Sequence, residues 1–292
     1  MSPPAFDPTR KQVIDVLGAS MAYVEHGRGD PIVLLHGNPT SSFLWRKVIP
    51  HLDDLGRCIA PDLIGMGDSE QVLSGPGAYG FLDHRRYLDA LLEQLDLGGN
   101  VTLVGHDWGG ALAFDWGRRH ANQVRGVAYM ETIVTPMTWD DWPASSTPIF
   151  KAMRGEAGEE IILEKNVFVE RIIPGSVLDP MPETVLDVYR RPYLEPGESR
   201  RPTLTWPREL PIDGTPAAMV EIAEANERWM GSPSVRKLFV NAEPGSLLVG
   251  RQREVCRSWP NQTEVTVRGS HFVQEDSGDE IGEAIAAWLS HS

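Results

Sequence analysis

The sequence is poor in cysteine. It contains two, Cys58 and Cys256, which lie far apart in the chain. A disulfide framework or a structural zinc site needs more cysteines in closer spacing. We therefore expect two reduced thiols in the core. We expect neither a bound metal ion nor a cofactor.

Long apolar runs are also missing, because no segment approaches the roughly 18 residues of a membrane-spanning helix. Residues 1–12, MSPPAFDPTRKQ, lack the apolar stretch of a secretory signal peptide. Positive charge is scarce, since 27 Lys and Arg stand against 41 Asp and Glu. Binding along a nucleic-acid backbone needs a basic surface. We expect a cytoplasmic protein, with the periplasm as the alternative, that binds neither membranes nor nucleic acids and is a monomer or a small homo-oligomer.

Apolar residues make up 41% of the 292-residue chain, which is enough for a large core in one or two domains. Strands and helices are predicted to alternate along much of it. The expected strands are 12–18, 20–27, 30–37, 57–65, 101–104, 124–131, 237–245 and 263–269. The expected helices are 42–54, 81–99, 111–120, 248–258 and 279–289. This alternation is typical of an α/β fold with a mainly parallel, doubly wound sheet.

The alternation stops between 134 and 213, where the sequence is rich in proline and tryptophan and contains no convincing strand. We interpret this stretch as a mostly helical cap domain inserted into an α/β core. The core domain would then comprise residues 1–133 and 214–292. An ordinary run of surface helices is the alternative interpretation.

The segment GHDWGG (105–110) lies between a predicted buried strand and a predicted helix. A nucleophile elbow of the form Gly-x-Ser-x-Gly requires the same order of strand, turn and helix. Gly105 and Gly109 permit the tight turn, and Gly110 allows the helix to approach the strand. Asp107 stands where such an elbow carries its serine, so we predict that Asp107 is the nucleophile. The alternative is a glycine turn in which Asp107 caps the helix.

A catalytic triad on this kind of fold follows the chain order nucleophile, acid, histidine. His271, in GSHF just after the last strand, is the best-placed histidine downstream of Asp107. Glu131 and Glu243 both follow a strand and lie between these two residues, so chain order leaves the acid open. The other downstream histidines lie in the helix after the elbow or at the chain end: His120 and His291.

An aspartate nucleophile implies a different reaction from a serine nucleophile. Its carboxyl group has an ordinary pKa near 3.9 and is charged at neutral pH, so it attacks without a base. A carboxylate is suited to displacement at a saturated carbon or an epoxide carbon, which forms an alkyl-enzyme ester. Water must then hydrolyse that ester, and His271 is the predicted general base for this step.

The leaving group decides between the two substrate classes. A departing halide needs N–H donors in a dry pocket, and the indole of Trp108 and the amide of Asn38 offer them. The backbone of HGNP (36–39) and the N–H of Trp108 can hold an oxyanion. An epoxide would need acidic O–H donors, and Tyr189 and Tyr193 in the cap keep that alternative open.

Several segments resemble the haloalkane dehalogenases, most of all the branch known from hexachlorocyclohexane degradation. The matching segments are HGNPTSSFLW, DLIGMGDS, GHDWGGALAFDW, YMETIV, RRPTLTWPRELPI, NQTEVTV and HFVQED. The likeness runs over nearly the whole chain, including the expected cap. It implies an α/β-hydrolase fold with a helical cap, no cofactor, and a small halogenated substrate.

The resemblance also implies roles for individual positions. Asp107 matches the nucleophile, His271 matches the residue that activates water, and Glu131 rather than Glu243 matches the catalytic acid. The residues implied in halide binding are Asn38, Trp108 and Pro207. The residues implied at the mouth of an access tunnel are Ser176 and Val177.

Other functions on the same scaffold are still possible at this point. Coelenterazine-oxidising luciferases share the fold, the GHDWG elbow and a similar cap, so a monooxygenase is one alternative. An epoxide hydrolase is another, although Asn38 stands where such enzymes tend to carry a bulky apolar residue after His-Gly. A binding module without catalysis is the third, and the intact triad argues against it.

Overall fold

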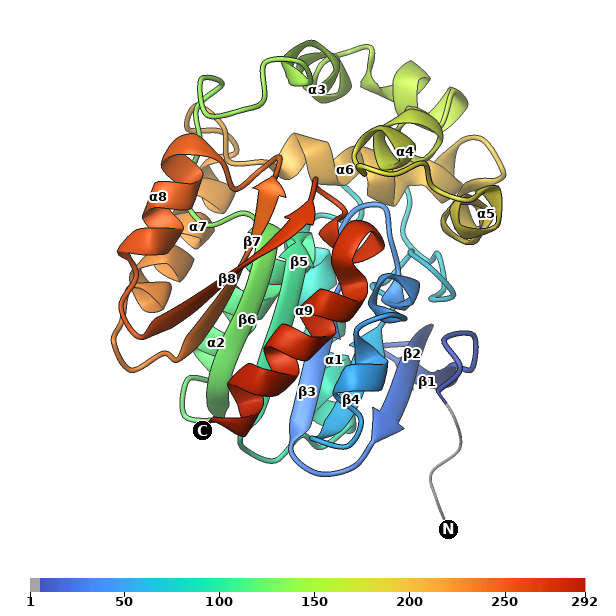
Figure 1. The fold of residues 1–292 in the computed structure, drawn as a ribbon. Helices are drawn as coiled ribbons and strands as arrows, with labels where there is room; N and C mark the ends of the chain where they lie inside the picture. Colours follow the sequence, from blue (N-terminus) through green and yellow to red (C-terminus); the bar gives the residue numbers. More distant parts are fainter. Residues whose placement is uncertain (1–5, 292) are drawn as a thin grey trace.

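The computed structural model describes residues 6–291, and its strands form one sheet in the order β1-β2-β4-β3-β5-β6-β7-β8. β1 and β2 are antiparallel to their neighbours, and the other pairs are parallel (Figure 1). The predicted α/β fold is confirmed. The strands are β1 (Gln12–Val16), β2 (Ala19–Gly27), β3 (Pro31–Leu35), β4 (Arg57–Pro61), β5 (Val101–Asp107), β6 (Val124–Thr132), β7 (Lys237–Pro244) and β8 (Gln262–Gly269).

Residues 1–5 and 292 lie outside the described part of the chain. These are the outermost residues of the expected core ranges and include the first five residues of the segment examined for a signal peptide. Within residues 6–291, no helix is both long enough and apolar enough to cross a membrane.

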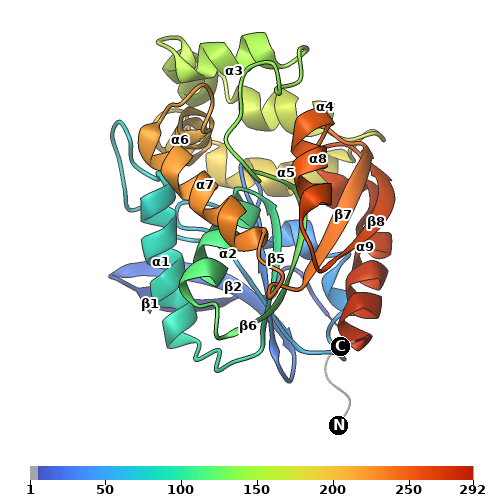
Figure 2. The ribbon, with the colours of Figure 1, turned by 90° about the vertical axis from the view of Figure 1, so that its left-hand side faces the viewer.

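Side chains alternate between two hydrophobic layers, as the two-residue period of a strand requires. In β3, Val33 and Leu35 face one layer, and Ile32 and Leu34 face the other. The first layer is covered by α1 (Phe81–Gln94), α2 (Trp108–Arg119), α7 (Ala217–Met230) and α8 (Gly250–Ser258). The second is covered by α9 (Val273–Ser290) and two short turns, η1 (Ser42–Trp45) and η2 (Ile49–His51). Figure 2 shows α1, α2 and α7 on the opposite side from α9.

Two stretches differ from the sequence-based expectation. The helix expected over 42–54 is two separate 3₁₀ turns, and Pro50 lies in the second, where its missing N–H prevents a continuous helix. Helix α7 was not predicted, although its buried residues recur every three or four positions, the spacing of one helix face. Those residues are Met219, Ala223, Asn226 and Met230.

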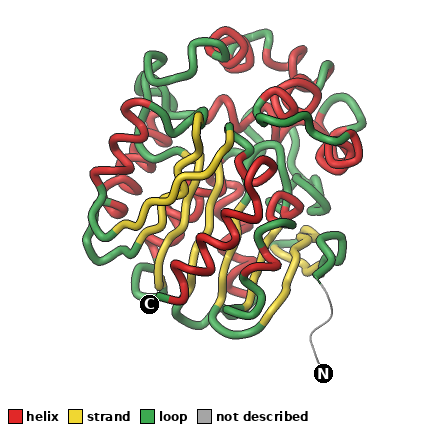
Figure 3. Tube along the Cα trace, viewed as in Figure 1, coloured by secondary structure: helices red, strands yellow, loops and turns green. Residues whose placement is uncertain are grey.

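The stretch expected as a cap, residues 134–213, consists of helices and loops above the carboxyl ends of the central strands (Figures 1 and 3). We call it the cap segment. Its two ends meet, because Met137 N–H donates to Pro211 O (2.9 Å) and Asp213 N–H donates to Met137 O (3.0 Å). Its helical elements are α3 (Thr147–Arg154), η3 (Glu160–Glu164), η4 (Phe168–Ile172), α4 (Ile173–Gly175), α5 (Glu183–Arg190), η5 (Arg191–Tyr193), η6 (Glu198–Arg200) and α6 (Arg201–Glu209).

The cap segment has a small apolar core of its own, formed by Met153, Ile162, Leu163, Phe168 and Leu204. The sheet layers hold the two cysteines, Cys58 and Cys256, which are free and buried as expected. Burial raises the pKa of each thiol to about 12, so neither forms a reactive thiolate at neutral pH.

Candidate active site

Asp107 is the last residue of β5, and α2 begins at the next residue. Its φ of 51° lies in the left-handed region, which is strained for a residue other than glycine and typical of a nucleophile elbow. Gly109 makes the turn possible, because a Cβ there would lie 2.1 Å from Leu35 O. The carboxylate makes no capping bond to α2. The geometry therefore supports a nucleophile elbow rather than a helix cap.

The two carboxylate oxygens of Asp107 have different surroundings. Oδ2 accepts the backbone N–H of Asn38 at 2.8 Å, and the nearby N–H of Trp108 also favours the charged form of this carboxylate. Oδ1 faces His271, whose Nε2 is 3.7 Å away. Gly37 lies so close that a Cβ at its position would be 2.3 Å from Oδ2. Burial raises the pKa of Asp107, although the charge of His271 and the two N–H groups oppose it.

Glu131 lies behind His271, with Oε2 3.5 Å from Nδ1 of the imidazole. It is fully buried, and its carboxylate also accepts three backbone N–H groups, those of Ser246, Leu247 and Leu248, at 3.0, 2.7 and 3.2 Å. These bonds leave the carboxylate little freedom to turn. The side chain therefore orients the ring of His271 through Nδ1 and leaves Nε2 directed at Asp107.

The charge of His271 is set by opposing effects. Burial alone lowers the pKa of His271, but the contact with Glu131 and the negative charges of Asp107 and Glu131 outweigh it. The net pKa lies above its ordinary value. Glu243, the other acid that chain order allowed, has an exposed side chain at the end of β7. The structure thus brings Glu131, and not Glu243, to the imidazole.

A cavity of about 600 Å³ lies between the strand ends and the cap segment. Six of the predicted site residues line it: Asn38, Asp107, Trp108, Ser176, Pro207 and His271. The cap adds apolar walls that sequence analysis did not single out, among them Trp142, Phe150 and Phe168. Val177 is not part of the lining, because its side chain packs against the layer around α9. The geometry gives no support to a tunnel position for Val177.

The two predicted halide donors face the same cavity. Asn38 Nδ2 lies 3.4 Å from Thr203 O, which leaves its second N–H free to point elsewhere. The indole of Trp108 stacks on Trp206 at 4.5 Å between ring centres, and Trp206 stacks on His84 at 4.2 Å. Burial lowers the pKa of His84 to about 3, so this ring packs as a neutral aromatic group. The stack fixes the plane of the Trp108 indole.

Sequence analysis missed Trp206 and His84. Trp206 directly precedes Pro207 in TWPREL, a segment that the resemblance had already marked, so its position was available as a signal. His84 lies in α1, which the helical pattern predicted, but nothing in that pattern distinguishes it from other residues of the helix.

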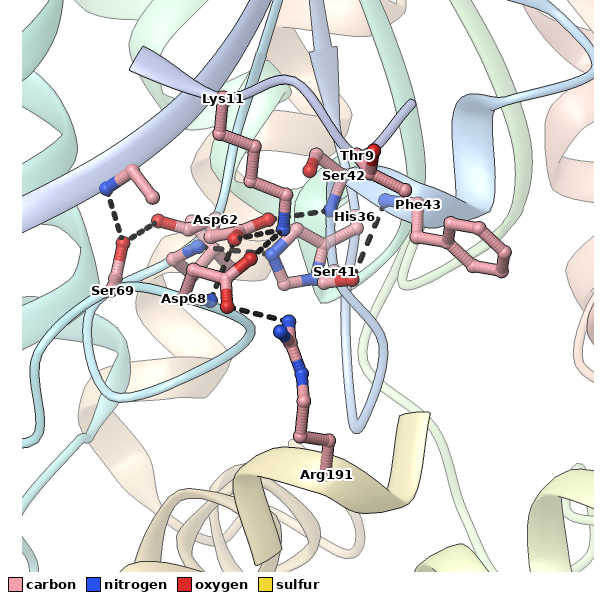
Figure 4. A network of polar contacts seen from close by, with 12 residues as sticks. Thr9, Lys11, His36, Ser41, Ser42, Phe43, Asp62, Asp68, Ser69 and Arg191 are labelled. Atoms are coloured by element: carbon pink, nitrogen blue, oxygen red, sulfur yellow. Dashed lines mark hydrogen bonds and ion pairs between the residues drawn. The ribbon is translucent and has the colours of Figure 1, made fainter. Parts of the chain in front are cut away.

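Asp62 is a fully buried carboxylate that bonds the backbone of Ser42, directly after the loop that carries Asn38 (Figure 4). Asp62 accepts Lys11 Nζ at 2.6 Å and the N–H groups of Ser42 and Asp68 at 2.8 and 2.7 Å. Asp68 in turn pairs with Arg191 of the cap segment at 2.5 Å. Asp62 lies in the DLIGMGDS segment, and its role in the fold was not predicted.

Replacement of Asp62 with Ala should lower the free energy of unfolding by about 3 kcal/mol. It would leave the buried N–H of Ser42 and the partly buried N–H of Asp68 without their acceptor and would remove one of the two carboxylates that pair with Lys11. Urea denaturation of the purified variant measures the loss. The matched control is Asp68→Ala, because that side chain is 35% exposed and should cost about 1 kcal/mol or less. Equal losses in the two variants would contradict this account.

The two cap tyrosines that kept an epoxide substrate open do not line the cavity. Tyr189 is buried and donates its hydroxyl to Glu275 Oε1 at 2.5 Å. Tyr193 is buried in the layer around α9. Burial raises the pKa of both phenols, which makes each a weaker acid. Neither hydroxyl is placed to protonate an epoxide oxygen beside Asp107.

Comparison with known proteins agrees with the fold and the site. A model of the alpha/beta hydrolase fold matches residues 30–171. A haloalkane dehalogenase of Sphingobium indicum is 56% identical over 280 residues, 96% of this chain and 95% of the relative. A haloalkane dehalogenase of Mycolicibacterium smegmatis is 50% identical over 283 residues, 96% of this chain and 91% of the relative.

Solved structures give the same result. Haloalkane dehalogenase DbeA from Bradyrhizobium elkani superposes with a TM-score of 0.91 at 38% identity, covering 97% of this chain and 98% of that one. DatA from Agrobacterium tumefaciens gives 0.90 at 34% identity, covering 97% and 96%. The sheet order and the elbow at Asp107 define an α/β-hydrolase. Within that class, the chain belongs to the haloalkane dehalogenase family.

Proposed function

We propose that this chain hydrolyses carbon–halogen bonds of small haloalkanes to an alcohol and a halide, with Asp107 as nucleophile. One observation carries the proposal: the carboxylate of Asp107 lies in a largely apolar cavity with one oxygen held by the backbone N–H of Asn38 and the other facing His271. The side chains of Asn38 and Trp108 line the same space. Family membership supports the same reaction.

In the first step, Asp107 Oδ1 attacks the carbon that carries the halogen. The C–X bond breaks, its electron pair leaves with the halide, and an ester forms between Oδ1 and the alkyl group. Oδ2 keeps its hydrogen bond from Asn38 N–H, becomes the ester carbonyl oxygen, and is positioned to accept the N–H of Trp108 as well. The halide gathers negative charge as it departs, and the indole N–H of Trp108 and the side-chain N–H of Asn38 stabilise it.

In the second step, His271 Nε2 takes a proton from water as the water oxygen attacks Cγ of Asp107. The negative charge that develops on Oδ2 is held by the same two backbone N–H groups. Glu131 stabilises the imidazolium through Nδ1. Collapse of the intermediate breaks the bond between Cγ and Oδ1, and the proton from His271 passes to the departing alkoxide. The products are the alcohol and the carboxylic acid of residue 107, which loses the second proton of the attacking water to solvent and so restores the carboxylate.

The proposal is tested by halide release from 1-bromobutane and 1,2-dibromoethane at slightly alkaline pH. We expect sustained release of halide with an equal amount of alcohol. In parallel, diol formation from styrene oxide tests the epoxide alternative, and light emission with coelenterazine tests the luciferase alternative. Failure to release halide from a broad panel of chlorinated, brominated and iodinated alkanes would contradict the proposal.

Replacement of Trp108 with Phe should slow the first step about 10²–10³-fold, the usual cost of removing one donor from an anion-stabilising site. Phe keeps an aromatic ring against Trp206 but lacks the indole N–H. Stopped-flow measurement of halide release in a single turnover isolates this step. Trp206→Phe is the matched control, since it also alters the stack but removes no donor from the cavity lining, and a similar slowing there would argue for packing instead.

Ester hydrolysis should lose rate as the pH falls through the pKa of His271, because the base must be neutral to accept a proton. The raised pKa of His271 moves this loss toward neutral pH. Alkylation removes the charge of Asp107, one of the groups that raises that pKa, so the ester form should titrate lower than the free enzyme. In rapid-quench experiments, the alkyl-enzyme should accumulate increasingly as the pH is lowered. A population of ester that does not change with pH would contradict this role for His271.

We propose that residues 134–213 form the cap domain and that 1–133 with 214–292 form the core domain. Support comes from the separate apolar core of the cap segment and from the bonds between Met137, Pro211 and Asp213, where the chain leaves the core and returns. Substrate would enter between cap and core, past Ser176. We also propose a cytoplasmic location, which the two free cysteines support, and a monomer or small homo-oligomer.

A further inference from the structure

We propose that His106 is a positioning residue that holds the backbone carbonyl of His271 and so aims the imidazole at the alkyl-enzyme ester; this inference rests on the proposed function. His106 directly precedes the nucleophile in β5. It is fully buried and is not part of the cavity lining. None of the chemical steps above uses it.

The contact between the two histidines is short and direct. His106 Nε2 lies 2.7 Å from His271 O, which is a strong hydrogen bond to a carbonyl. The two rings also pack at 4.8 Å between their centres, and the ring of Phe272 lies 5.8 Å from that of His106. His106 thus fixes both the peptide group and one side of the ring of the base.

The protonation state of His106 follows from its partner. A carbonyl oxygen accepts hydrogen bonds only, so Nε2 must carry the proton. Burial and the charge of His271 lower the pKa of His106 well below its ordinary value, so the ring is neutral and Nδ1 has no proton. Within residues 6–291, Nδ1 has no hydrogen-bond partner. Among the described residues, the ring of His106 therefore makes one hydrogen bond, from Nε2 to the carbonyl oxygen of His271.

The segment around His271 has three anchors. Ser270 N–H donates to Asp276 Oδ2 at 2.9 Å, and Phe272 N–H donates to Ser176 O of the cap segment at 3.1 Å. The bond from His106 is the third, and it joins the backbone of this segment to β5, the strand that carries Asp107. Because residues 106 and 107 are consecutive in one strand, this bond ties the position of the base to the position of the nucleophile.

The consequence is specific to one half of the reaction. His271 acts in ester hydrolysis and has no role in the attack of Asp107 on the haloalkane. A loss of alignment of about 1 Å costs roughly 10²-fold in rate. Removal of the His106 donor should therefore slow hydrolysis of the ester by about that factor and leave the rate of alkylation within a few-fold of the wild-type value.

The test compares His106→Leu, which has no donor, with His106→Gln, whose side-chain amide nitrogen can take the place of Nε2. Each variant is mixed with 1,2-dibromoethane, quenched at times from milliseconds to minutes, and analysed by intact-protein mass spectrometry. We expect the Leu variant to accumulate the alkyl-enzyme and to show a burst of about one halide per active site. The Gln variant should recover most of the hydrolysis rate.

His120→Leu is the matched control, because His120 also bonds a backbone carbonyl, Trp116 O at 2.9 Å, and lies outside the cavity lining. It should behave as the wild type. If His106→Leu does not fold, His106→Asn replaces it, since its shorter amide cannot reach the carbonyl of His271. Equal slowing of both steps, or no rescue by Gln, would overturn the inference. If the wild type and His271→Phe also form no adduct, it is the proposed function that fails.

Discussion

Replacement of His271 with Phe should stop turnover after one halide per active site and leave a stable alkyl ester on Asp107. The attack of Asp107 needs no base, because the nucleophile is a carboxylate and its Oδ2 is already held by Asn38 N–H. Hydrolysis of the ester does need a base, and the removal of general-base catalysis typically costs about 10²–10⁴-fold. Intact-protein mass spectrometry after incubation with 1-bromobutane should show one added butyl group.

His120→Phe is the control for this substitution, since it places the same ring at a histidine outside the cavity lining. It should turn over normally and carry no adduct. Peptide mapping should locate the butyl group of the His271→Phe variant on Asp107. A variant that neither turns over nor forms an adduct, while the wild type is active, would show that His271 is needed for the first step and that the division of labour is wrong.

Replacement of Asp107 with Ala should abolish both halide release and adduct formation. Removal of the nucleophile from a covalent enzyme lowers turnover by roughly 10⁶-fold, close to complete loss in a steady-state assay. No other carboxylate described in the structure lines the cavity. Halide release and intact-protein mass spectrometry, measured on the same samples, test the two outcomes together.

A labelling experiment on the wild type gives an independent measure of the same step. Water attacks Cγ of Asp107 and not the alkyl carbon, so a single turnover in H₂¹⁸O should place the label in the carboxylate of Asp107. The alcohol from that turnover should carry ordinary oxygen. Label in the alcohol after one turnover would mean that water attacks the substrate directly, and Asp107 would then be a base instead of a nucleophile.

Glu131→Gln and Glu243→Gln separate the two acids that chain order left open. Glu131→Gln should slow ester hydrolysis and lower the pKa of His271, because the contact with Glu131 and its charge both raise that pKa. Glu243→Gln should retain wild-type rates, since Glu243 is exposed. The pH dependence of single-turnover hydrolysis measures both effects. The reverse pattern would assign the acid to Glu243.

Much of the site was accessible from local sequence because parallel strands bring their carboxyl ends to one edge of the sheet. Asn38 follows β3, Asp107 ends β5 and Glu131 is the second-to-last residue of β6. These strands are neighbours in the order β3-β5-β6. The glycines of GHDWGG marked the elbow before any coordinates. Helix α7 also has a readable pattern, because its buried residues recur at helical spacing.

Other features depended on contacts between segments distant in the chain. Whether Tyr189 and Tyr193 face the cavity was undecidable from the sequence, and the fold turns Tyr189 toward Glu275 instead. Ser176 and Val177 are adjacent in the chain, yet one lines the cavity and the other packs against the core. A helical period predicts which residues share a face, but it does not state what that face contacts.

The sequence by itself determined the class of fold and predicted the nucleophile and the histidine that would serve it, because glycine spacing and strand order are local properties of the chain. The tertiary structure decided which acid reaches that histidine and which oxygen of Asp107 faces it. The backbone of Glu131 adopts a φ of 42°, and its carboxylate is held by N–H groups more than a hundred residues away. Such an orientation arises from packing between remote segments.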